Sequence, residues 1–204
     1  MRHKEIFGLV VSGKSLLEAP QTIGGTDFGM SDDNTRYQYT RHLLNLSPKM
    51  LEDTQNYELY HCIDRDHECY FALEKPHGTL IYFVKCETSH FGFVGPAVTQ
   101  VAVWRDIKSS ASYGIGDHLF FDVLLGIYPT VMSDEQQTSR GRDFWIIRMA
   151  KAPQLGFRIG LADTKTKTVE WKDETTLAAK WIQDHESAWS TDPASRNIRF
   201  IVSK

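Results

Sequence analysis

The fold of this chain depends on residues 97–125, which read AVTQVAVWRDIKSSASYGIGDHLFFDVLL. Up to Arg105 the apolar residues fall on both alternating faces, which is typical of a strand buried in the middle of a sheet. Residues 106–112 are polar and have no period, so they indicate a loop. Apolar residues then recur at a helical spacing, namely Leu119, Phe120, Val123 and Leu124. The stretch therefore predicts a strand, a loop, a glycine turn and a helix.

The glycine turn at residues 113–118 is suited to binding an anion. The first N–H groups of a helix have no partner within the helix, and the helix dipole places partial positive charge there. Glycine lets a phosphate approach the backbone and tolerates positive φ. The alternative is that Gly114 and Gly116 only make a tight turn, and Asp117 also counts against an anion site.

This region resembles the signature region of the GNAT acetyltransferase superfamily. In that family a central strand separates from its neighbour, and a loop Arg/Gln-x-x-Gly-x-Gly/Ala opens the next helix and holds the acetyl-CoA pyrophosphate. The resemblance implies an acetyl-CoA site that contains Val101, Val103, Tyr113, Gly114, Ile115 and Gly116. Arg142 is a further candidate for a phosphate contact. Ala111 stands where the family has Arg or Gln, which is a departure from its pattern.

Composition narrows the class of protein. With 204 residues, 41% of them hydrophobic and 12% aromatic, the chain can bury one sizeable core. The net charge of −3 provides no global basic field for nucleic acid or an anionic membrane, although a local basic patch stays open. No apolar run approaches the roughly 18 residues of a membrane span, and residues 1–15 lack a signal-peptide core. Three cysteines without a CxxC pair favour the reducing cytoplasm.

Residues 1–56 are expected to form an extension packed on the core. Residues 5–11 are a candidate edge strand, and residues 20–39 have the glycine and polar content of a loop. A short helix is predicted at 37–46. Ser47, Pro48 and Glu52 together predict a second helix that ends near Gln55.

Residues 57–204 predict an α+β core with a mixed, mostly antiparallel sheet flanked by helices. Segments 57–63, 68–74, 79–91 and 99–105 are rich in β-formers and read as an antiparallel meander. After the helix at 115–126, the order predicted is a strand at 128–132, a helix at 138–155 that Gly156 ends, strands at 157–162 and 168–172, a helix at 177–189 and a strand at 197–202.

This order of elements is similar to that of the GNAT fold across residues 57–172. Gly156-Phe157 resembles the family's helix ending before the penultimate strand. The segment SDEQQTSRGRDFW, residues 133–145, also resembles sequences of phage-encoded members of the family. The first 50 or so residues do not align with the family's opening elements.

Acyl transfer needs a base for the amine and an acid for the leaving thiolate. Glu74 and Glu87 are the carboxylates best placed at the strands, with Tyr82 and His90 as nearby alternatives. Asp134 follows the short strand that lines the family's cleft, so it is a third catalytic candidate. No tyrosine lies between Gly141 and Phe157, where the family places its acid; Ser133 or unassisted departure of the thiolate would replace it.

Two metal-site alternatives arise from local clusters. His and Cys residues crowd into residues 61–69, and strand alternation would put His61 and Cys69 on one face, although no zinc spacing template is matched. Asp163 with Glu170-Trp171-Lys172 is similar to the D…ExK set of metal-dependent nucleases. The structural explanation of the first cluster is a cysteine packed in a strand and histidines at a turn, and that of the second is a closing hairpin.

The sequence therefore predicts a cytoplasmic acyltransferase that moves an acetyl or other acyl group from CoA to an amine, with no metal. The competing hypothesis is a GNAT-like fold without acetyl transfer, acting as a binding module or a nucleic-acid-modifying protein. The sequence does not identify the acceptor, for which a small molecule, a peptide, a protein and a nucleic acid all stay open. Self-association as a homodimer also stays open.

Overall fold

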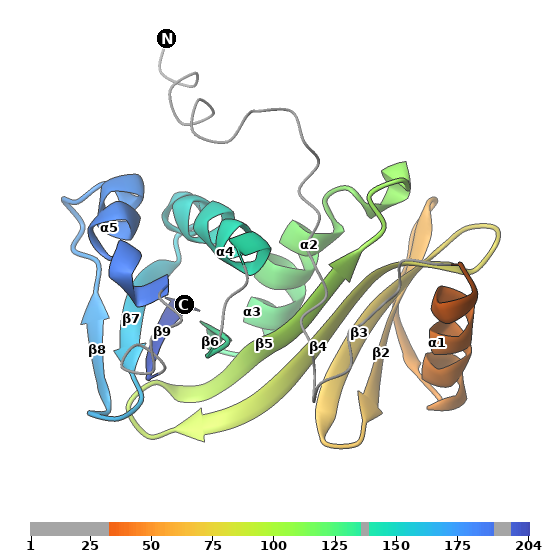
Figure 1. Ribbon diagram of the computed structural model, residues 1–204, viewed down its shortest axis with the longest axis horizontal. Helices are drawn as coiled ribbons and strands as arrows, with labels where there is room; N and C mark the ends of the chain where they lie inside the picture. Colours follow the sequence, from red (N-terminus) through yellow and green to blue (C-terminus); the bar gives the residue numbers. More distant parts are fainter. Residues whose placement is uncertain (1–32, 136–138, 190–196) are drawn as a thin grey trace, which may run out of the picture.

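The chain folds around one mixed β-sheet (Figure 1). The structure, a computed structural model, describes residues 33–135, 139–189 and 197–204. In these ranges the sheet has nine strands in the order β1-β2-β3-β4-β5-β6-β9-β7-β8. All neighbouring strands are antiparallel except β5 and β6, which are parallel. The predicted α+β class, with a mixed and mostly antiparallel sheet, is confirmed.

The elements follow the predicted order from residue 57 onward. The strands are β1 (Lys49–Asp53), β2 (Tyr57–Asp64), β3 (His67–Glu74), β4 (Thr79–Phe91), β5 (Gly95–Arg105), β6 (Thr130–Ser133), β7 (Arg158–Asp163), β8 (Thr168–Trp171) and β9 (Ile198–Ser203). The helical segments are α1 (Asp33–Asn45), η2 (Ser110–Ser112), α2 (Ile115–His118), η3 (Leu119–Leu124), α3 (Leu125–Ile127), α4 (Ser139–Lys151), η4 (Ala152–Leu155), α5 (Ala178–Asp184) and η5 (Glu186–Trp189).

The segment before residue 57 differs from its prediction. Ser47 and Pro48 do not start a helix, because Ser47 takes a positive φ of 54° and residues 49–53 form strand β1. This strand pairs antiparallel with β2, the next strand along the chain, and that pairing outweighs the capping signal. The loop predicted at 20–39 is helical from Asp33 onward, while its earlier part and the candidate strand at 5–11 lie outside the described residues.

Different helices cover the two faces of the sheet. The helices that follow β5 bury one face, and that core includes Tyr82, Val84, Cys86, Val98, Phe120, Trp145 and Phe200. On the other face α1 packs over β4, where Tyr39 meets Phe83 edge to face with ring centroids 5.2 Å apart. Leu43 of α1 is fully buried in that second cluster. The sheet is thus a layer between α1 and the later helices.

One continuous helix runs through α2, η3 and α3 after the glycine turn. Its middle turn is π-helical, and the apolar side chains predicted to face the core, Leu119, Phe120 and Leu124, are buried there. The helix returns the chain from the end of β5 to the start of β6, which is why those two strands run parallel. In the described ranges no helix combines the length and the apolar character needed to cross a membrane.

Candidate functional site

Strand β5 contains a bulge at Val101. Gln100 lies opposite Cys86 of β4 and Ala102 lies opposite Lys85, so Val101 is an extra residue without a partner in the ladder. A bulge bends its strand and increases the local twist, and bulges are common beside active sites. Strand β5 therefore changes direction near its middle.

Strand β6 leaves β5 at this same place. The parallel pairing runs from Ala97 opposite Thr130 to Gln100 opposite Ser133 and then stops. Strand β5 continues to Arg105, and within the described ranges this second half pairs only with β4. Figure 1 shows β5 extending past the short β6 toward α2. We call this place the β5–β6 divergence: the edge of residues 101–105 together with the last pair, Gln100 and Ser133.

The loop after β5 is held by side chains from several elements. Arg36 of α1 forms an ion pair with Asp106. The Ser112 hydroxyl donates to the carbonyl oxygens of Asp106 and Ser109, each at 2.8 Å. The Ser109 hydroxyl donates to a carboxylate oxygen of Glu74 at 2.7 Å. The path from β5 to the glycine turn is therefore fixed.

Glu74 and Glu87, the two carboxylates predicted as bases, lie at opposite ends of the sheet. Glu74 is opposite Thr79, the first residue of β4, where it anchors the loop through Ser109. Glu87 lies near the other end of β4, about 25 Å away at the rise of a strand residue. Only Glu87 is near the β5–β6 divergence, since it lies opposite Thr99.

The two glycines of the predicted anion turn serve different purposes. Gly114 has φ +82°, the left-handed conformation that glycine tolerates best, and a Cβ there would meet nothing within 4 Å. Gly116 has ordinary backbone angles, but a Cβ there would lie 2.7 Å from the Tyr82 hydroxyl oxygen and 2.6 Å from an Arg148 guanidinium nitrogen. Gly114 thus makes the turn, and Gly116 lets the helix dock on the sheet.

Two cations of α4 lie at the start of this helix. Lys151 pairs with Asp117 at 2.6 Å, and the Arg148 Nε lies 3.5 Å from the other Asp117 carboxylate oxygen. Asp117, which counted against an anion site in the sequence, is therefore matched by two positive side chains. Ile115 is buried, whereas Tyr113 is exposed beneath the Arg105 guanidinium, 5.4 Å from the ring centroid.

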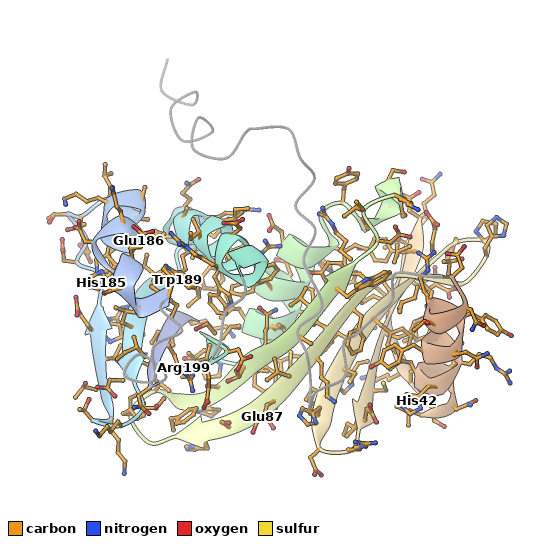
Figure 2. The ribbon with its side chains drawn as sticks, viewed as in Figure 1. His42, Glu87, His185, Glu186, Trp189 and Arg199 are labelled. Atoms are coloured by element: carbon orange, nitrogen blue, oxygen red, sulfur yellow. The ribbon has the colours of Figure 1, made fainter. Side chains whose placement is uncertain are left out.

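Arg142, the predicted phosphate contact, faces a different partner. It pairs with Glu186 at 2.5 Å, and Figure 2 shows Glu186 at the α5 end of the molecule. Sequence analysis did not identify Arg148 and Lys151 as the cations beside the glycine turn. Their spacing of three places both on one side of a helix, but it does not say which side meets the glycine turn.

Asp134 lies just after β6, beside the divergence. Its carboxylate accepts a hydrogen bond from the Glu135 N–H at 2.6 Å. Burial raises the pKa of Asp134, that hydrogen bond and the Arg199 charge oppose the rise, and the charges of Glu135 and Glu87 add to it. Arg199 of β9 is buried and pairs with Glu135 at 2.7 Å. The structure thus brings together Glu87 and Asp134, two of the three predicted catalytic residues.

The structure does not support the two metal-site alternatives. Cys62 lies opposite Cys69 across the hairpin, so His61 is on the other face, next to Tyr70, and the predicted pairing of His61 with Cys69 is wrong. Asp163 accepts hydrogen bonds from the N–H groups of its own turn. In the described part of the chain no group of three or more His, Cys, Asp or Glu side chains could hold a metal ion.

The arrangement combines a strand edge that can hydrogen-bond to an extended ligand, two cations at a helix start and a carboxyl group with a raised pKa. No family model, curated protein or solved structure matches this chain. The same strand–turn–helix connection joins all three features, and this makes the β5–β6 divergence the candidate site.

Proposed function

We propose that the chain is a GNAT-type acyltransferase that binds acetyl-CoA at the β5–β6 divergence and passes the acyl group to an amine. One observation carries this proposal: the bulge at Val101, the end of the parallel pairing and the glycine turn all belong to one connection between two adjacent parallel strands. That combination is what the resemblance in residues 97–125 implies.

The strand order adds support. The antiparallel strands β1 to β5 are followed by the parallel β6, and β9 inserts between β6 and β7. In this order β5 and β6 are the fifth and sixth of the nine described strands, so the divergence lies near the centre of the sheet. An extended pantetheine arm would lie along residues 101–105, where amide groups of the arm can hydrogen-bond to the backbone as a neighbouring strand would.

The cation pair supports placing the CoA phosphates at the glycine turn. Arg148 and Lys151 flank Asp117 there, so the local charge is positive by one. An anion at the turn would gain both cations and the partial positive charge of the helix start. Ala111 takes the place of the family's Arg or Gln, and in this proposal the α4 side chains supply the missing positive charge.

Asp134 is the base in this proposal, with Glu87 and Arg199 setting its electrostatic surroundings. Its raised pKa suits proton transfer nearer to neutral pH than an ordinary Asp allows. Asp134 would take the proton from the amine nitrogen as that nitrogen forms a bond to the thioester carbonyl carbon and the carbon–sulfur bond breaks to release the thiolate of CoA. The departing sulfur then takes a proton from solvent or from Ser133.

The test is calorimetric titration of the full chain with acetyl-CoA and, separately, with CoA. Gly114 provides a matched pair of variants, because a side chain there meets open space and both Asn and Asp tolerate a positive φ. We expect Gly114→Asn to bind nearly as the wild type and Gly114→Asp to bind about tenfold more weakly, since only Asp adds a like charge beside the phosphates.

Failure of the wild type to bind acetyl-CoA or CoA would contradict the proposal and favour a GNAT-like fold without acetyl transfer. Binding that is equally strong in Gly114→Asp would show that the phosphates lie elsewhere. Binding of acetyl-CoA with the expected order of the variants would support the proposal.

A further inference from the structure

Gln100 is a buried polar side chain at the β5–β6 divergence. It is only 5% exposed, and within the described ranges its side-chain oxygen Oε1 has no hydrogen-bond partner. It lies opposite Cys86, so the two side chains share the face that the later helices cover, where Cys86 is fully buried. Gln100 also occupies the last β5–β6 pair, directly before the strands separate.

The groups nearest to Gln100 in the sheet make no hydrogen bond to its Oε1 within the described ranges. Ser133, its partner in the last pair, accepts a hydrogen bond from the Phe200 N–H at 3.0 Å. The neighbouring side chains on the same face, Val98 and Cys86, are apolar or weakly polar. A buried carbonyl oxygen without a donor is unfavourable, and such groups are rare enough in proteins to need an explanation.

We propose that Gln100 is a ligand-binding residue whose Oε1 accepts a hydrogen bond from an amide N–H of the acyl-pantetheine arm. This inference rests on the proposed function, because it assumes that the arm enters the divergence. An arm that runs along residues 101–105 ends its path at the Gln100–Ser133 pair, where the strands close. Its last amide group carries an N–H donor, which is the group that Oε1 lacks.

The location explains why a polar residue is kept in an apolar core. The unpaired oxygen destabilises the protein without ligand, and the ligand removes this cost when it binds. An apolar residue of similar size should therefore help folding and harm binding. A residue with a purely structural role would not show these opposite effects.

The experiment compares the wild type with Gln100→Met, which keeps the length of the side chain and removes the amide. Without ligand, we expect the melting temperature of Gln100→Met to rise by about 2–4 °C. Its affinity for acetyl-CoA should fall about tenfold. Its affinity for adenosine 3′,5′-bisphosphate, which has the 3′-phosphate and the first 5′-phosphate of CoA but no pantetheine arm, should stay the same.

The control is Thr99→Val, which removes a hydroxyl group from the adjacent position on the opposite face of β5. It should leave the affinity for both probes unchanged. Unchanged acetyl-CoA affinity in Gln100→Met, or equal loss for both probes, would overturn this inference alone. If the wild type binds neither probe, the proposed function fails and this inference fails with it.

Discussion

The two halves of β5 belong to one strand but have different surroundings. Residues 97–100 pair with β4 on one edge and β6 on the other, whereas residues 101–105 pair with β4 alone. Both halves hold buried residues, such as Val98 and Trp104. One extra residue, Val101, separates the two halves.

The comparison shows how one strand can be paired on both edges in one half and on a single edge in the other. The first half has its backbone groups satisfied on both edges and serves as the centre of the sheet. The second half keeps buried side chains such as Trp104 but has one backbone edge without a strand partner in the described ranges, which is where we propose that the ligand binds. The bulge bends the strand away from β6 without moving its side chains to the wrong face.

Deletion of Val101 is the most direct way to remove this difference. Without it Gln100 still lies opposite Cys86 and Ala102 opposite Lys85, so every side chain keeps its face. We expect the variant to fold and to lose acetyl-CoA affinity by about 100-fold or more, because a straight strand closes the edge. Circular dichroism and calorimetric titration measure the two effects.

The control for that deletion is Val101→Ala, which keeps the extra residue. It should bind as the wild type does, since the backbone carries the contacts. A deletion variant that folds and binds acetyl-CoA normally would show that the bulge does not create the site.

Substitution of the two glycines tests how the second half is held in place. Gly116→Ala should lower the free energy of unfolding by about 1–3 kcal/mol, because its Cβ meets Tyr82, which lies opposite Arg105, and Arg148. Gly114→Ala should cost about 1 kcal/mol, since only its positive φ is unfavourable. Urea unfolding of both variants measures the difference, and equal losses would contradict the docking role of Gly116.

Asp134→Asn tests the residue that directly follows β6, and its expected effect on stability is the smallest of those described. Because burial raises the Asp134 pKa in the folded state, folding favours the protonated form, and this carboxyl destabilises the protein as the pH rises above its unfolded pKa. Asn keeps an oxygen to accept the Glu135 N–H. The variant should therefore gain stability relative to the wild type between pH 4 and pH 7, in urea unfolding at each pH.

The same variant separates stability from catalysis. If Asp134 is the base, Asp134→Asn should slow acyl transfer by about 100-fold and leave acetyl-CoA affinity unchanged. A stability difference that is constant with pH would contradict the raised pKa, and an unchanged transfer rate would remove Asp134 as the base.

Local patterns predicted most elements after residue 57. Alternating β-formers separated by turn residues gave β2, β3 and β4, and the helical spacing of Leu119, Phe120 and Leu124 placed the long helix after the glycine turn. These signals are local, because each depends on residues a few positions apart. The prediction of a helix at Ser47 was wrong because the local capping signal does not account for the pairing of β1 with β2.

The residues of the candidate site needed the tertiary structure. Glu74 and Glu87 look alike as strand-end carboxylates, yet one holds the loop through Ser109 and the other lies at the divergence. Arg142 and Arg148 are on one helix, and only the packing of α4 decides which one reaches Asp117. No local pattern marks Gln100, whose place in the last β5–β6 pair is set by the strand register.

The sequence by itself determined the order of the elements from residue 57 onward, the buried face of the long helix and the glycine turn, because hydrophobic spacing and backbone preferences act between near neighbours in the chain. Only the tertiary structure decided the extra residue at Val101, the end of the β5–β6 pairing and the side chains that meet there. Strand register and helix packing join residues far apart in the sequence, and their hydrogen bonds form only when the whole sheet does.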